Sequence, residues 1–195
     1  MTEKKNVNND RVIILKGEKV ALVVPEKSDL DLWYKGINNQ EINKFLIIGN
    51  TIITREAQEK WYNEEANNET RKVLCIMSLE TGNIIGNVGI HDIDNFHRIA
   101  EVGIIIFKSD EHSKGFGTES VKLITHYGFH RLNLRKIKIE YFGNNKGGEI
   151  AYKRVGFKEI GRYTKEYYAN GKYEDRVMME IFKEEFYEKY PEFLK

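Results

Sequence analysis

The stretch from Ala100 to Gly128 constrains the fold of this chain more than any other. It opens with an apolar, β-branched run from Val102 to Phe107, which has the length and composition of a fully buried strand. A polar break and a loop with Gly115 and Gly117 follow, and the apolar residues after the loop recur three and four positions apart, as in an amphipathic helix. The stretch therefore predicts a strand, a glycine loop and a long helix in succession.

This order of elements predicts an anion site at the start of the helix. The first backbone N–H groups of a helix have no internal partner, and they point forward together with the positive end of the helix dipole. Glycines at positions 115 and 117 remove Cβ atoms and permit positive φ angles, so that successive N–H groups can converge on one phosphate. A turn without a ligand is the alternative explanation of the same two glycines.

Two nucleotide motifs are excluded by the spacing. The loop lacks the lysine that follows the second glycine of an ATP-binding P-loop, and Ser120 stands where a dinucleotide-binding fingerprint has its third glycine. We therefore expect a phosphate carrier other than ATP or NAD.

Composition excludes further classes of partner. The 195-residue chain has a net charge of +1, which gives it no general attraction for nucleic acid or an anionic membrane. It has no apolar run long enough to cross a bilayer, and residues 1–10 lack the apolar core of a signal peptide. The single cysteine, Cys75, lies in an apolar run, where a thiol behaves as a small hydrophobic group and not as a nucleophile. We expect a cytoplasmic protein without disulfides.

The rest of the chain predicts hairpin-linked strands mixed with helices. Strand patterns lie at residues 12–15, 20–24, 73–79, 84–90, 136–142, 163–168 and 172–181. Helical patterns lie at residues 30–37, with a capping-box pattern at 28–31, and at 54–66, 149–155 and 183–190. Residues 41–53 predict a short helix and a loop, which is either the wall of a substrate cleft or a packed connection. These patterns indicate a mixed α/β (α+β) fold with helices on both faces of one sheet.

The domain boundaries follow from the same patterns. Residues 1–10 are polar and are expected to form a flexible tail, residues 11–182 form one domain, and residues 183–195 form a C-terminal extension.

Three motifs in this order resemble those of the GNAT superfamily of acetyl-CoA-dependent N-acetyltransferases. Residues 112–117, HSKGFG, are similar to its pyrophosphate loop [QR]-x-x-G-x-[GA], and residues 145–157, NKGGEIAYKRVGF, to its signature N-x-x-[AS]-x-x-x-Y-x-x-x-G-F. Residues 98–104 and 170–175 resemble the RimJ/RimL-like branch and the related spermidine acetyltransferases. The resemblance covers residues 11–182 and implies a largely antiparallel, twisted sheet of six or seven strands that splays between its two middle strands.

The resemblance also implies acetyl-CoA as co-substrate and a set of residues that bind it. In this family the backbone of the splayed strand, here Gly103 to Phe107, stabilises the reacting carbonyl and holds the pantetheine arm. The residues implied to bind the co-substrate are Ile104, Ile105, Ile106, Phe107, His112, Ser113, Lys114, Gly115, Phe116, Gly117, Thr118, Asn145 and Tyr152.

Two departures from the family motifs stand out. His112 replaces the usual glutamine or arginine, which matters little because backbone N–H groups hold the pyrophosphate. Gly147 and Gly148 replace alanine or serine at the start of a short helix, and glycine costs about 1 kcal/mol relative to alanine inside a helix. We therefore expect this helix to be shortened or mobile.

The catalytic roles are implied for a tyrosine and a carboxylate. Tyr152 matches the family tyrosine and, with an ordinary pKa of about 10, can protonate a departing thiolate. Glu101 is the candidate base for the amine, with a structural ion pair as its alternative role, and His91 is the second candidate. We expect no metal site, because His126 and His130 lie four apart without the glutamate of a zinc motif or a third ligand.

The acceptor is left open between a peptide N-terminus and a small-molecule amine. A polyamine is an alternative, although the apolar segment Phe45 to Gly49 lacks the carboxylates that a cationic chain requires, and only Glu41 lies nearby. An acyl-CoA sensor without transferase activity is a further alternative. A homodimer is possible, and nucleic acid and membrane are not expected as partners.

Overall fold

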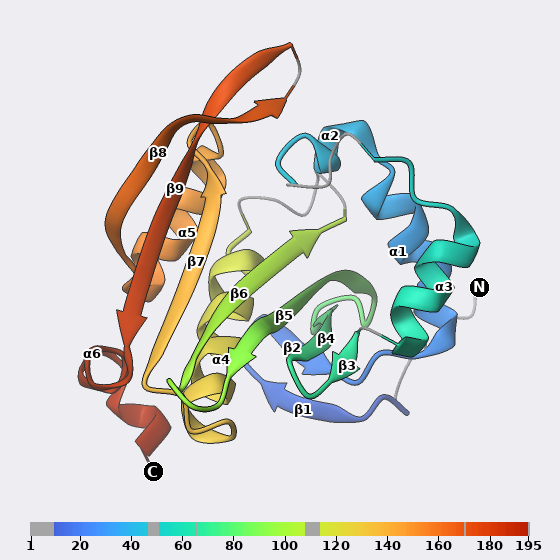
Figure 1. Ribbon diagram of the computed structural model, residues 1–195. Coiled ribbons are helices and arrows are strands. Elements are labelled where there is room, and N and C mark those ends of the chain that lie inside the picture. The colour runs from blue at the N-terminus through green and yellow to red at the C-terminus, as the bar shows by residue number, and fades with distance from the viewer. Residues whose placement is uncertain (1–9, 47–50, 65, 108–113, 170, 195) are drawn as a thin grey trace.

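The computed structural model describes residues 10–46, 51–64, 66–107, 114–169 and 171–194, and these residues form one central sheet with helices around it (Figure 1). The expected tail at residues 1–10 lies almost entirely outside the described residues. The strands are β1 (Ile13–Lys16), β2 (Val20–Val23), β3 (Asn67–Asn68), β4 (Arg71–Ser78), β5 (Ile84–Asp94), β6 (Ile99–Ile106), β7 (Lys136–Phe142), β8 (Lys158–Ala169) and β9 (Lys172–Phe182). The helices are α1 (Leu30–Ile37), α2 (Gln40–Asn43), α3 (Arg55–Glu64), α4 (Phe116–His130), α5 (Lys146–Val155) and α6 (Lys183–Lys189).

The sheet is mostly antiparallel, and it has nine described strands where six or seven were expected. Eight of them follow the order β1-β2-β4-β5-β6-β7-β9-β8, and β3 pairs with β4 at the side. Sequence analysis placed no strand at Asn67 and Asn68, which directly follow the helical pattern at residues 54–66. Asn67 instead exchanges side-chain hydrogen bonds with the backbone N–H and C=O of Val73, at 3.0 and 3.3 Å, which ties this short strand to β4.

Strands β6 and β7 are the only parallel pair among the described strands, and they separate after a short contact. Their pairing runs from Ile99 opposite Lys136 to Glu101 opposite Lys138 and ends there, although both strands continue. The expected splay is therefore confirmed. It opens the sheet on the side of the glycine loop that precedes α4.

Helices cover both faces of the sheet, as expected. On one face, Ile124 of α4, Val155 of α5 and Phe186 of α6 belong to the larger hydrophobic core. On the other face, Trp33 of α1 packs with Cys75 and Phe107 in a smaller core. Phe186, in the segment expected to form a C-terminal extension, is therefore buried in the main core.

None of the described helices is both long and apolar enough for a membrane crossing.

The expected capping box at residues 28–31 is wrong. The Asp29 carboxylate accepts hydrogen bonds from the buried Arg11 guanidinium, at 3.0 and 2.7 Å, and from the backbone N–H of Glu26, at 2.8 Å. The side chain of Asp29 therefore does not cap α1. The local capping box lies two residues earlier than expected, because Glu26 and Asp29 form it around the 3-10 turn Lys27–Asp29.

Candidate active site

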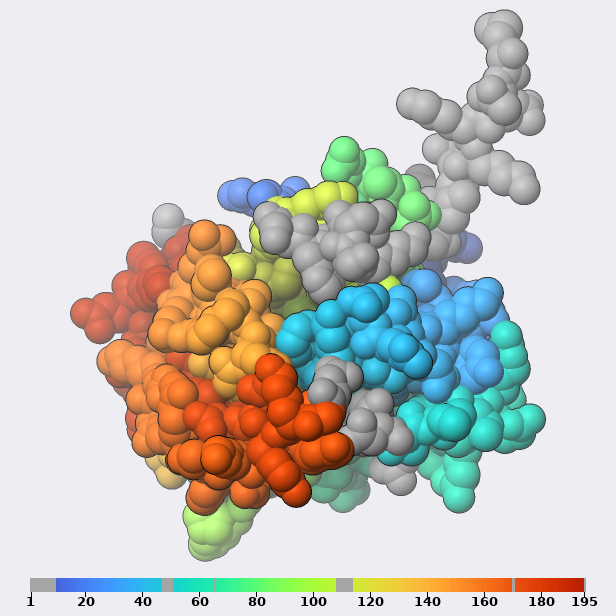
Figure 2. Space-filling view, turned by 90° about the horizontal axis from the view of Figure 1, so that it is seen from above, coloured from blue at the N-terminus to red at the C-terminus, as the bar shows by residue number. Residues whose placement is uncertain are grey.

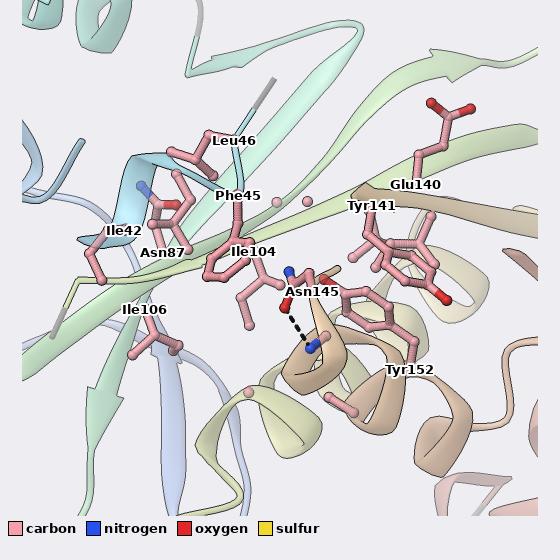
Figure 3. A pocket seen from close by; sticks show the side chains of 18 of the residues that line it. Ile42, Phe45, Leu46, Asn87, Ile104, Ile106, Glu140, Tyr141, Asn145 and Tyr152 are labelled. Carbon is pink, nitrogen blue, oxygen red and sulfur yellow. Dashed lines mark hydrogen bonds between the residues drawn. The ribbon is translucent and has the colours of Figure 1, made fainter. Parts of the chain in front are cut away.

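A cavity of about 1210 Å³ lies where β6 and β7 separate, between the start of α4, the start of α5 and the segment around α2 (Figure 3). Most of the expected binding and catalytic residues line it. They are Glu101, Ile104, Ile105, Ile106, Phe107, Gly115, Gly117, Thr118, Asn145 and Tyr152. Lys114 is not among the described lining residues, the side chain of Phe116 is buried in the main core, and His112 and Ser113 lie outside the described residues.

The exposed edge of β6 provides backbone donors to the cavity. The N–H of Phe107 donates to the carbonyl of Ile85 on β5 at 2.9 Å, so this N–H is not available to a ligand, contrary to expectation. Successive backbone N–H groups of a strand point to opposite sides, so the N–H of Ile104 faces away from β5. That direction leads into the gap, because the pairing with β7 has ended at Glu101.

The glycine loop has the geometry that an anion site requires. Gly115 adopts a left-handed conformation, with φ of 89°, and caps α4, which begins at Phe116. A Cβ atom built on Gly117 would meet no described atom within 4 Å, so open space lies in front of the first turn of the helix. The residues of this turn line the cavity with backbone N–H groups that the helix itself cannot satisfy.

Tyr152 is held at the cavity by the start of α5. The Asn145 side chain accepts a hydrogen bond from the N–H of Gly148 at 2.9 Å, and Figure 3 shows Asn145 and Tyr152 side by side next to Ile104. The Tyr152 ring packs against Tyr141 with 5.5 Å between centroids, and Tyr152 is only 6% exposed. Burial raises the pKa of Tyr152, so its hydroxyl stays protonated.

The helix that carries Tyr152 is not shortened by its two glycines. It begins at Lys146, before Gly147 and Gly148, where the sequence pattern indicated a start at Glu149. The hydrogen bond from Gly148 to the Asn145 side chain satisfies one of the free N–H groups of the first turn. The cap thus compensates for the low helix propensity of glycine.

The two candidate bases, Glu101 and His91, lie together on neighbouring strands. His91 Nε2 is 4.0 Å from Glu101 Oε1, and a Cβ on Gly103 would lie 3.3 Å from His91 Nε2, so the missing side chain leaves room for the imidazole. Burial raises the pKa of Glu101, and the nearby negative charge of Glu140 raises it further. His91 is the only ion-pair partner of Glu101 within the described residues.

Sequence analysis missed Glu140 as a cavity residue. Glu140 belongs to an alternating strand pattern that indicated a solvated face, but β7 brings it to the cavity. Arg176 of β9 binds its carboxylate with Nε at 2.6 Å and Nη2 at 2.5 Å. This long-range pair holds a second carboxylate near Glu101 and has no signal in the local sequence.

The segment around α2 forms the apolar wall of the cavity, which was one of the two expectations for residues 41–53. Ile42, Phe45, Leu46 and Ile53 line the cavity, and residues 47–50 lie outside the described part of the chain. Figure 2 shows this segment next to the hairpin of β8 and β9 on one face of the molecule. The cavity therefore has an apolar wall, and its charged lining residues are Glu101 and Glu140 together with Arg71, Lys146 and Arg154.

The other titratable candidates take no part in the cavity. Cys75 is fully buried, its Sγ lies 3.3 Å from Asp29 Oδ2, and burial raises the pKa of the thiol, which agrees with an inert cysteine. The rings of His126 and His130 stack with 5.2 Å between centroids. No cluster of three metal-binding side chains occurs among the described residues.

Comparisons with known proteins agree with this geometry. The chain matches the family model for an acetyltransferase (GNAT) domain over residues 19–158. It is 28% identical to the spermidine N(1)-acetyltransferase of Vibrio cholerae over 169 residues, which cover 86% of this chain and 95% of the relative. It is 31% identical to the putative ribosomal N-acetyltransferase YdaF of Bacillus subtilis over 107 residues, 55% of this chain and 58% of the relative.

The fold comparison gives the same result. The crystal structure of spermidine N-acetyltransferase from Vibrio cholerae in complex with CoA and spermine matches with a TM-score of 0.79 and 26% identity, over 87% of this chain and 99% of that one. The family match covers residues 19–158, which is most of the chain. The chain belongs to the GNAT family of acetyl-CoA-dependent N-acetyltransferases.

Proposed function

We propose that the cavity between β6, β7 and α2 holds acetyl-CoA beside a primary amine, and that the amine attacks the acetyl group directly. The observation that carries this proposal is the convergence of three features on one cavity. They are the N–H of Ile104 on an unpaired strand edge, the first turn of α4 and the protonated Tyr152. An oxyanion, a diphosphate and a leaving thiolate each require one of these features.

The donor side of the cavity suits the co-substrate. The backbone N–H groups of Gly117 and Thr118 would hold the diphosphate, because they lie in the first turn of α4 and line open space. The edge of β6 around Ile104 would hydrogen-bond the pantetheine arm and the carbonyl oxygen. Asn145 would help to position the same arm from the start of α5.

The proton transfers are assigned to Glu101 and Tyr152. Glu101, directly or through a water molecule, takes a proton from the ammonium of the acceptor, and the neutral amine nitrogen then bonds to the carbonyl carbon. The carbon–sulfur bond breaks, and the thiolate takes the proton of the Tyr152 hydroxyl. The acylated nitrogen gives up its second proton to water, and water restores the Tyr152 proton, so that the products are an N-acetylated amine and CoA.

The acceptor is proposed to be a small-molecule amine or a peptide N-terminus. Spermidine is a second candidate, because the Vibrio cholerae relatives are named for it and Glu101 and Glu140 place two carboxylates at the cavity. The apolar wall of Ile42, Phe45 and Leu46 does not provide a site for a second cation. A location in the cytoplasm and a homodimer remain predictions.

An acetyl-CoA thiol-release assay against amino acids, N-terminal peptides and polyamines tests the proposed function. We expect release of CoA with at least one class of primary amine, and no release with the corresponding tertiary amines. Tight binding of acetyl-CoA without release for any amine would support the acyl-CoA sensor instead.

A further inference from the structure

The turn between β1 and β2 lies against the loop that precedes α4, and we propose that Lys19 in this turn is a positioning residue for the diphosphate of acetyl-CoA. The inference rests on the proposed function, because it assumes that the diphosphate lies at the start of α4. Lys19 lies outside the family motifs. It precedes Glu119, in the first turn of α4, by 100 residues in the chain.

A carboxylate on α4 fixes this turn. Glu119 Oε1 accepts a hydrogen bond from the N–H of Glu18 at 2.9 Å, and Oε2 accepts from the N–H groups of Lys19 and Val20, each at 2.8 Å. Hydrogen bonds to a charged acceptor are stronger than neutral ones, and a carboxylate in the first turn of a helix is also favoured by the helix dipole. Glu119 therefore joins the β1–β2 turn to the part of α4 that would face the diphosphate.

The glycine at the turn makes this contact possible. A Cβ atom on Gly17 would lie 2.6 Å from Cδ of Glu119 and 2.8 Å from each carboxylate oxygen. Any other residue at this position would displace the carboxylate.

Lys19 makes a second contact, with the glycine loop itself. Its Nζ donates a hydrogen bond to the carbonyl oxygen of Lys114 at 2.9 Å, and a Cβ on Gly115 would lie 3.2 Å from the same Nζ. Gly115 is the left-handed residue at which the loop turns into α4. Lys19 thus binds the peptide unit between Lys114 and Gly115, directly before α4.

The orientation of that peptide unit connects Lys19 to the cavity. In a trans peptide, the carbonyl of Lys114 and the N–H of Gly115 point in opposite directions. Gly115 lines the cavity, whereas Lys19 is not among the described lining residues. By holding the carbonyl on the outer side of the loop, Lys19 turns the N–H of Gly115 toward the cavity and keeps a carbonyl dipole away from the anion.

The alternative is that Lys19 only braces the fold. The three hydrogen bonds of Glu119 already fix the turn and do not use the Lys19 side chain, because they involve its backbone. The Lys19 side chain can therefore be substituted without removing the hydrogen bonds of Glu119. A positioning role and a bracing role differ in whether the effect depends on the diphosphate.

The test compares Lys19→Met, Lys19→Arg and the control Lys16→Met, which removes the same charge from the exposed part of β1. The readouts are the Kd of CoA by calorimetry, the Tm of the free enzyme, and kcat/KM with acetyl-CoA and with acetyl-pantetheine, which lacks the diphosphate. We expect Lys19→Met to raise the Kd of CoA and lower kcat/KM for acetyl-CoA by about tenfold, the equivalent of one charge-assisted contact. Neither kcat/KM for acetyl-pantetheine nor the Tm should change by much. Lys19→Arg should recover most of the affinity for CoA.

Several outcomes would overturn the inference. An unchanged Kd of CoA would exclude a positioning role, and an equal loss with both donors would show that Lys19 only braces the fold. An equal rise in the Kd of CoA with Lys16→Met would show that the effect comes from net positive charge and not from the position of Lys19. If Lys19→Met does not fold, Lys19→Gln removes the charge but keeps a polar side chain, and it must weaken CoA but not acetyl-pantetheine. Failure of the unmodified enzyme to bind CoA at all would instead disprove the proposed function.

Discussion

Gly148 lies directly against the Tyr152 ring. A Cβ atom on Gly148 would lie 3.1 Å from Cε2 of Tyr152 and 2.9 Å from Nδ2 of Asn145, whereas a Cβ on Gly147 would meet only Oδ1 of Asn145, at 3.8 Å. The second glycine therefore leaves room for the Asn145 cap and for the ring. The first glycine has no such role.

This difference predicts opposite effects for two similar substitutions. Alanine is favoured over glycine in a helix by up to about 1 kcal/mol, so Gly147→Ala should raise the Tm and leave kcat unchanged. Gly148→Ala should lower kcat severalfold, because the added methyl group displaces the ring or the cap by a few tenths of an ångström. Thermal unfolding and steady-state kinetics measure both, and equal kcat values for the two variants would disprove a steric role of Gly148.

Tyr152→Phe should lower kcat at least about tenfold, because the thiolate loses its proton donor, while the Kd of CoA stays nearly constant. Tyr141→Phe is the matched control. The Tyr141 hydroxyl is buried without a hydrogen-bond partner in the described structure, so its removal should change neither kcat nor stability by much. A Tyr152→Phe variant with unchanged turnover would contradict the assignment.

The pH dependence of kcat/KM should report the raised pKa of Glu101. A base is active when ionised, so the raised pKa places the ascending limb at a higher pH than for an ordinary glutamate, and activity is lost as the pH falls through it. Glu140→Gln removes the neighbouring negative charge and should move this limb to lower pH. Glu101→Gln should abolish the limb and lower kcat/KM roughly a hundredfold.

A matched variant separates Glu101 from its neighbour in this experiment. His91→Gln should keep the ascending limb, because the carboxylate is retained. If Glu101→Gln kept the limb and His91→Gln lost it, His91 would be the base.

The native enzyme should resist thiol alkylation. Cys75 is fully buried and burial raises the pKa of its thiol, so little reactive thiolate is present at pH 8. Iodoacetamide should label Cys75 only after unfolding and leave activity intact. Rapid labelling of the folded enzyme with loss of activity would contradict this account.

Local patterns predicted the elements of the site well. The β-branched run at Val102 to Phe107 and the helical spacing after Gly117 were sufficient to place β6 and α4, although β6 begins earlier, at Ile99. The splay itself came from the family resemblance, because no local signal indicates where two parallel strands separate. The residue ranges of single strands and helices are thus predictable where neighbouring residues in the sequence determine the structure.

Contacts between distant segments were not predictable in the same way. Glu140 belonged to a pattern typical of a solvated strand face, yet Arg176 and Glu101 meet it only through the register of three strands. Lys19 reaches Lys114 across the β1–β2 turn for the same reason. A single sequence contains the residues of such contacts but not the pairing that brings them together.

A crystal structure of the enzyme with bound CoA is the most direct test of the central claim. We predict that the diphosphate accepts hydrogen bonds from the backbone N–H groups of Gly115 to Thr118, and that the sulfur lies within hydrogen-bond distance of the Tyr152 hydroxyl. A diphosphate bound elsewhere, or a sulfur separated from Tyr152 by the width of the cavity, would contradict the proposed mechanism.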